Sequence, residues 1–238
     1  MIKIGKNLSE WSAYSCQPKS NGKLNRIIND RISKEGPYCD LNDIDVSQIT
    51  DMSYLFYKSE FNGDISEWNV SNVKSMDYVF YYAECNQDIS KWNISKVTNM
   101  RGMFLSSKFT GDISKWDVSN AIDMRNMFSR SEFNGDISNW NVSNVENMSF
   151  MFAYSKFNAD ISNWNVSKVK DMSWMFDRSK FNDDISKWDV SNVENMYRML
   201  SNSKFNQDIS NWKIDKDCRT TAMFNDCPIK EEYKPKIE

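Results

Sequence analysis

Residues 136–159 read DISNWNVSNVENMSFMFAYSKFNA, and this stretch is one copy of a unit that recurs along most of the chain. The copies begin at Asp40, Asp64, Asp88, Asp112, Asp136, Asp160, Asp184 and Asp208, which gives a spacing of 24 residues without insertions. We number positions within a repeat from this leading Asp, which is position 1. A fixed period of this length is the signature of a chain built from stacked structural repeats.

The large apolar residues follow this period closely. Every Met except Met1 falls at position 13 or 16, and every Phe except Phe150 falls at position 17 or 22. Position 5 is occupied by a ladder of tryptophans, Trp68, Trp92, Trp116, Trp140, Trp164, Trp188 and Trp212. Because a single repeat cannot bury these side chains alone, we expect them to form a continuous core and not a ligand-binding stack.

The spacing of apolar residues changes within each repeat. In residues 140–143, WNVS, apolar and polar residues alternate, which favours a short half-buried strand. The next apolar residues, Val145, Met148, Met151 and Phe152, have the spacing of one or two helical turns. The sequence therefore predicts an α/β repeat solenoid of eight 24-residue strand–helix units, with a parallel sheet on one side.

The segment before the repeats predicts one further helix. Leu24, Ile27, Ile28 and Ile32 share one helical face, with Asn21 as the expected N-cap and Gly36 as the stop. A stack of repeats needs its first apolar layer covered, so we expect this helix to be an N-terminal cap. The expected organisation is an N-terminal segment (1–39), an eight-repeat solenoid (40–231) and a C-terminal tail (232–238).

The repeat D-I-S-x-W-N-V-S-N-V-x-x-M-x-x-M-F with a trailing F-N-x-D resembles the BspA-like leucine-rich-repeat family of bacterial surface proteins. The resemblance runs from Asp40 to about Phe224 and recurs in eight copies. It implies a leucine-rich-repeat-like solenoid and a role in adhesion or protein–protein contact. The family carries no catalytic residues that could be placed on this chain.

Composition and motifs exclude several classes of function. The chain has 238 residues, a net charge of −3 and no histidine, which removes imidazole bases, imidazole metal ligands and Ser/His or Cys/His nucleophile pairs. Phosphate-binding and dinucleotide-binding glycine motifs are absent from the sequence, as are the basic character typical of nucleic-acid binding and any long apolar run that could insert into a membrane. We therefore expect a protein that is not an enzyme, with no cofactor and no metal.

The ladder of aspartates at position 1 allows three interpretations. It could form calcium sites, supply catalytic carboxylates, or accept backbone N–H hydrogen bonds in the turn between repeats. Calcium requires six to eight oxygen ligands, whereas positions 22 to 24 offer mostly Phe, Asn and Gly. The turn interpretation is favoured.

The candidate binding residues are aromatic side chains that vary between repeats. If positions 10, 13, 16 and 17 point inward, positions 14, 15, 18 and 19 point outward. Two clusters result: Tyr54, Tyr57, Tyr78, Tyr81 and Tyr82 near the N-terminus, and Phe150, Tyr154, Trp174 and Tyr197 further along. Exposed aromatic clusters are typical of interaction sites, although the same rings could instead pack between neighbouring helices.

The leading functional hypothesis is a non-enzymatic protein–protein interaction scaffold that binds through these aromatic residues. The alternative is a bacterial surface adhesin or antigen that binds a host protein. We expect a protein partner, a monomer, and a cytoplasmic location because the sequence begins without a secretory signal or anchor motif, with the cell surface as the alternative.

Overall fold

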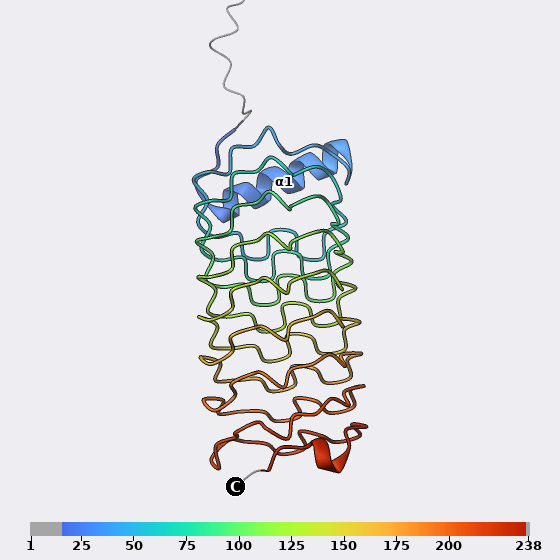
Figure 1. The fold of residues 1–238 in the computed structure, drawn as a ribbon. Coiled ribbons are helices and arrows are strands. Elements are labelled where there is room, and N and C mark those ends of the chain that lie inside the picture. Colours follow the sequence, from blue (N-terminus) through green and yellow to red (C-terminus); the bar gives the residue numbers. More distant parts are fainter. Residues whose placement is uncertain (1–15, 237–238) are drawn as a thin grey trace, which may run out of the picture.

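The computed structural model describes residues 16–236, which form a stack of coils with one repeat in each circuit (Figure 1). Its regular elements are the helix α1 (Asn21–Glu35), which lies across one end of the stack, and the short 3-10 helix η1 (Glu231–Tyr233) at the other end (Figure 1). Between them, the path of each coil is made of turns and irregular segments.

The N-terminal helix is confirmed with nearly the expected bounds. Its N-cap is Ser20, one residue before the predicted Asn21, and the Ser20 side chain accepts a hydrogen bond from the backbone N–H of Lys23. Gly36 ends the helix with a φ of 89°, and its N–H donates to the carbonyl of Ile32. Leu24 and Ile28 are fully buried, so α1 covers the end of the core as a cap must.

The prediction of one helix per repeat is wrong. Positions 15 and 19 of the repeats adopt positive φ, as in Phe150 and Tyr154, both at 58°. A residue in this left-handed region interrupts a right-handed helix. Residues 148–155 instead form consecutive tight turns, in which Met151 N–H donates to the Met148 carbonyl and Ser155 N–H to the Phe152 carbonyl.

The predicted parallel sheet is wrong as well. Neighbouring repeats in the described part of the chain are joined by isolated parallel bridges at position 12, such as Asp123 to Asn147. The segment 140–143 turns before it can extend, because the Asn141 side chain accepts the Ser143 N–H at 3.2 Å. The fold is therefore not an α/β or leucine-rich-repeat-like solenoid, since its coils carry neither strands nor repeated helices.

Alternate backbone amides connect one coil to the next. Phe150 N–H donates to the Ser173 carbonyl and Phe152 N–H to the Met175 carbonyl, both at 2.9 Å. Between them, Met151 N–H points back across its own turn to the Met148 carbonyl at 3.1 Å. The segment that carries positions 13 to 20 of each coil thus satisfies its backbone without a strand or a helix.

Short polar side chains shape the corners of each coil. In the fifth repeat, the side chains of Asp136, Asn141 and Asn147 accept the backbone N–H two residues further on. The Ser155 hydroxyl does the same for the N–H of Phe157. The expected turn role of the position 1 aspartates is therefore confirmed, and these hydrogen bonds hold the pKa of Asp136 below its ordinary value.

The tryptophan ladder forms the core, as predicted. Trp140 is 3% exposed, and its indole N–H donates to the carbonyl of Ile113 in the preceding repeat at 3.1 Å. The same bond recurs in the repeats on either side, for example from Trp164 to Ile137. Each indole therefore packs in the core and also ties its coil to the preceding one.

We predict that Trp140→Ala lowers the free energy of unfolding by about 3–5 kcal/mol, because it leaves a cavity and removes the hydrogen bond to Ile113. Urea denaturation followed by tyrosine and tryptophan fluorescence measures this change. Ile122→Ala is the matched control, since that side chain is 45% exposed and its loss should cost less than about 0.5 kcal/mol. Equal effects of the two substitutions would contradict the stabilising role of the ladder.

Candidate binding face

The aromatic residues predicted as a binding surface come from positions 14, 15, 18 and 19, which follow one another along one side of the stack. Four of them are exposed, namely Tyr54, Tyr57, Tyr82 and Tyr154, with exposed fractions between 39% and 50%. The other five, Tyr78, Tyr81, Phe150, Trp174 and Tyr197, are half-buried. We call this surface the aromatic face.

The five N-terminal tyrosines form one continuous cluster. Tyr54 stacks on Tyr78 of the next repeat with ring centroids 5.1 Å apart, and Tyr57 lies 5.2 Å from Tyr81. Tyr81 in turn contacts Tyr82 at 4.7 Å. The rings thus pack between neighbouring coils and still leave part of their surface open to solvent.

The second cluster has the same character. Phe150 and Trp174 stack at 5.5 Å with an angle of 10° between their planes, and Tyr197 meets Trp174 edge-on. Tyr154 is separated from these rings and is flanked by two arginines: the Arg130 guanidinium carbon lies 4.1 Å from its centroid and that of Arg178 lies 5.7 Å away. Both clusters are therefore preorganised by contacts within the protein.

A groove of about 380 Å³ lies between the two clusters. Its lining consists of Tyr81, Tyr82, Leu105, Ser106, Asn126, Ser129, Arg130, Phe150, Tyr154 and Trp174. The groove exists because smaller residues interrupt the ladders of rings: position 18 changes from Tyr81 to Leu105 and Ser129, and position 19 from Tyr82 to Ser106.

Gly102 leaves room for the Tyr78 ring of the preceding repeat. It has a φ of 56°, and a Cβ built there would lie 2.2 Å from the Tyr78 ring. The Tyr78 ring therefore leans over the backbone of Gly102, while its hydroxyl accepts a hydrogen bond from Arg101 Nε at 3.1 Å. Tyr78 also contacts Tyr81, which lines the groove, with ring centroids 5.3 Å apart, so these contacts support the N-terminal side of the groove.

The groove contains residues that the sequence did not single out. Leu105, Ser106, Asn126 and Ser129 form its floor, and none of them is aromatic. The sequence feature that could have indicated these residues is the absence of aromatic residues from positions 15 and 19 of the third and fourth repeats. Such a gap forms a groove only if the aromatic rings in the repeats on both sides keep projecting from the surface.

A buried carboxylate lies beside the second cluster. Asp177, at position 18, is 0% exposed, and neither carboxylate oxygen has a hydrogen bond within residues 16–236. Arg178 Nε is 3.8 Å from one of these oxygens. Burial raises the pKa of Asp177, and the opposing influence of the positive charge on Arg178 is smaller.

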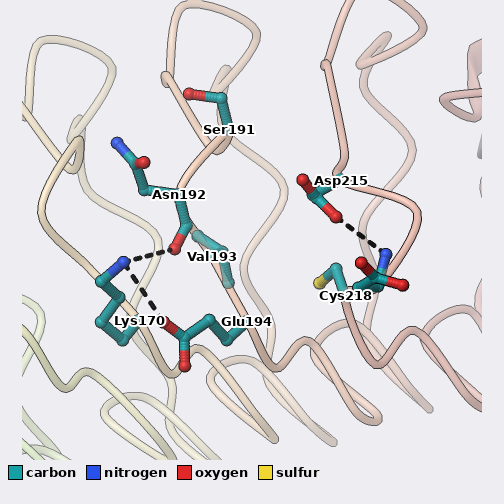
Figure 2. A pocket seen from close by; sticks show the side chains of 8 residues that line it. Lys170, Ser191, Asn192, Val193, Glu194, Asp215 and Cys218 are labelled. Carbon is teal, nitrogen blue, oxygen red and sulfur yellow. Dashed lines mark hydrogen bonds and ion pairs between the residues drawn. The ribbon is translucent and has the colours of Figure 1, made fainter.

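A separate hollow of about 280 Å³ is lined by residues of the last three repeats (Figure 2). Lys170 lies 3.2 Å from a Glu194 carboxylate oxygen, and Asp215 accepts the Asp217 N–H at 2.8 Å. Cys218 opens onto the same hollow, and burial raises the pKa of its thiol (Figure 2). Lys170 and Glu194 are thus paired with each other, and no group of three or more His, Cys, Asp or Glu suited to a metal occurs in the described range.

The fold and the aromatic face define a repeat protein with a preorganised surface. The chain matches the family described as "Mycoplasma protein of unknown function, DUF285" over residues 33–135 and 129–234. These matches cover well over half of the chain, which therefore belongs to this family. The assignment to the BspA-like leucine-rich repeats is wrong, because this is a different family.

No curated protein and no solved structure gives a significant match to the chain. Within residues 16–236, no helix combines the length and the apolar character needed to cross a membrane.

We predict that Asp177→Ser raises the free energy of unfolding at pH 7, because it removes a carboxylate whose ionisation burial opposes. Serine already occupies the same position at Ser129 and Ser201. A carboxyl whose pKa is raised by folding destabilises the folded state progressively as pH rises above the unfolded pKa of about 4. The advantage of the variant should therefore shrink as pH is lowered from 7 towards 4 in urea denaturation.

Asp160→Asn is the control, because folding lowers the pKa of Asp160 and its substitution should therefore destabilise the protein at pH 7. The Ser162 N–H lowers the pKa of Asp160, so its charge stabilises the fold above the unfolded pKa and this contribution disappears on acidification. If Asp177→Ser raises the free energy of unfolding by the same amount at pH 4 and pH 7, the effect comes from packing and not from charge.

Proposed function

We propose that this chain is a non-enzymatic protein-binding scaffold whose contact surface is the aromatic face. The observation that carries the proposal is the combination of exposed and half-buried rings with arginines on one side of a rigid stack. Tyrosine, tryptophan and arginine are the residues that most often dominate the energy of protein interfaces. Tyr154 between Arg130 and Arg178 is a local example of this combination.

Preorganisation supports the same proposal. Immobilising flexible side chains on binding costs about 0.5–1.5 kcal/mol for each one. On this face the cost is reduced beforehand, because Tyr54 stacks on Tyr78 and Phe150 on Trp174 in the free protein. The positive φ of positions 15 and 19 also holds the backbone of these residues in a fixed turn.

The difference between the two sides of the coil favours this surface over the others. The opposite corners repeat nearly the same Asp, Asn and Ser side chains in every coil, and these are engaged in local turns, as Asp136 is with Ser138. Positions 14, 15, 18 and 19 instead differ from one repeat to the next. Only a surface that varies along the stack can distinguish one partner from another.

The test is selection of a random displayed peptide library on the immobilised protein, with parallel binding to Tyr82→Ser/Tyr154→Ser. Serine occupies the same position 19 at Ser106, so the double variant should fold. We expect enriched peptides to bind the unmodified protein and to lose at least about tenfold in affinity for the double variant, as expected for two aromatic contact residues.

Tyr38→Ser is the control, because Tyr38 is 77% exposed and precedes the first repeat. It should bind the selected peptides as the unmodified protein does. Failure to enrich any peptide, or enrichment of peptides that bind all three proteins equally, would contradict the proposal. Urea denaturation of each variant separates loss of binding from loss of fold.

A further inference from the structure

The groove between the two aromatic clusters is lined by residues of five successive repeats along the axis of the stack. Its lining begins at Tyr81 and Tyr82 in the second repeat and ends at Trp174 in the sixth. Four intervals of about 4.8 Å, the usual distance between backbone-bonded neighbouring chains, give a length of roughly 19 Å. An extended peptide of about six residues has this length.

The groove carries one uncompensated charge. Arg130 is the single charged residue in its lining, and its guanidinium carbon lies 4.1 Å from the centroid of the Tyr154 ring. No ion pair of Arg130 occurs within the described part of the chain, whereas the nearby Arg125 is paired with Asp123 at 2.6 Å. A guanidinium has five N–H donors, and stacking on a ring leaves its edge free to bind a carboxylate.

The aromatic face around the groove also carries a positive charge. In the first seven repeats, positions 14, 15, 18 and 19 hold two acidic residues, Asp77 and Asp177, both of which the fold buries at least in part. Against these, the same positions hold six basic residues: Lys58, Arg101, Arg125, Arg130, Arg178 and Arg198. The aromatic face is thus cationic on a chain whose net charge is −3.

We propose that this groove binds an extended acidic peptide segment of a partner protein, in which an Asp or Glu lies between two apolar residues at alternate positions. The carboxylate pairs with Arg130, and the apolar side chains pack against Leu105 and Tyr82 on one side and Phe150 and Trp174 on the other. Alternate side chains of an extended peptide point the same way, which places all three in the groove. The inference rests on the proposed function and specifies the chemistry of the partner.

An anionic glycan is the main competing ligand and is less well matched. Sulfated or carboxylated glycans carry several charges, whereas a single arginine lines this groove among nine uncharged residues. In a peptide with one central carboxylate and flanking apolar groups, the carboxylate can pair with Arg130 and the apolar groups can pack against the aromatic rings.

The experiment uses fluorescence anisotropy with two labelled, end-capped peptides, Phe-Ser-Glu-Ser-Phe-Ser and Phe-Ser-Lys-Ser-Phe-Ser. We expect the Glu peptide to bind at least about tenfold more tightly than the Lys peptide, the ratio that one charge-assisted hydrogen bond supplies. Added salt should reduce this ratio.

Two variants test the groove by different routes. Arg130→Gln should bring the affinities of the two peptides within about threefold of each other, because it removes the charge and keeps a polar side chain. Ser106→Tyr should weaken both peptides by at least about tenfold, because it continues the ring ladder through the floor of the groove. Tyrosine already occupies position 19 at Tyr82 and Tyr154, so this variant should fold.

Lys58→Gln is the matched control. Lys58 is a cation at the same position 19 but lies outside the groove lining, so its loss should leave the preference for the Glu peptide intact. Equal binding of the two peptides, tighter binding of the Lys peptide, or an unchanged preference in Arg130→Gln would overturn the inference. A heparin oligosaccharide that binds more tightly than the Glu peptide and depends on Arg130 would identify an anionic glycan as the ligand instead.

The outcomes separate this inference from the function on which it rests. Library selection that yields face-dependent peptides without an acidic residue would refute the acidic segment and keep the protein-binding scaffold. Absence of binding by peptides of either charge, together with a failed selection, would refute both.

Discussion

The alternation of backbone hydrogen bonds along positions 13 to 20 is the constraint on which the rest of the structure depends. One amide donates to the next coil and the following one donates back across its own turn, as Phe152 and Ala153 do. This alternation requires a left-handed residue at positions 15 and 19, which costs a non-glycine residue about 1–2 kcal/mol. The cost recurs in every coil and is offset by a backbone that stays paired throughout the stack.

This backbone arrangement explains why the aromatic face can vary. The side chains at positions 15 and 19 project from turns whose hydrogen bonds are made by the main chain alone, so their identity is free to change. Phe150 and Gly102 adopt nearly the same φ, 58° and 56°, although one has an aromatic side chain and the other has none. The stack therefore remains regular while its outer surface becomes a sequence of rings, arginines and gaps.

On the inner side of the coil, by contrast, the identity of the side chain is restricted. Trp140 must fill the core and also reach the Ile113 carbonyl, so tryptophan recurs at position 5 from the second repeat to the last. Where a charged residue enters the packed layer, as Asp177 does, its ionisation opposes folding. Burial at this position raises the pKa of the carboxyl in proportion to how well the surrounding coils exclude water.

The amino-acid sequence by itself determined the period, the buried ladders of Trp, Met and Phe, the terminal helix and the turn role of Asp136, because each depends on local chemistry repeated at fixed spacing. It could not decide the conformation of residues 145–152. The spacing of Val145, Met148 and Met151 fits a helix and also fits turns whose side chains all point inward, and left-handed residues such as Phe150 are not glycines.

The tertiary structure decided between these alternatives, because only neighbouring coils supply the carbonyls that accept every second amide. The gap at Ser106 and Ser129 likewise became a groove through contacts between coils, since the Tyr154 ring beside it is held by Arg130 of the preceding repeat. Composition and period describe one coil at a time, whereas the groove and its uncompensated arginine depend on how several coils stack.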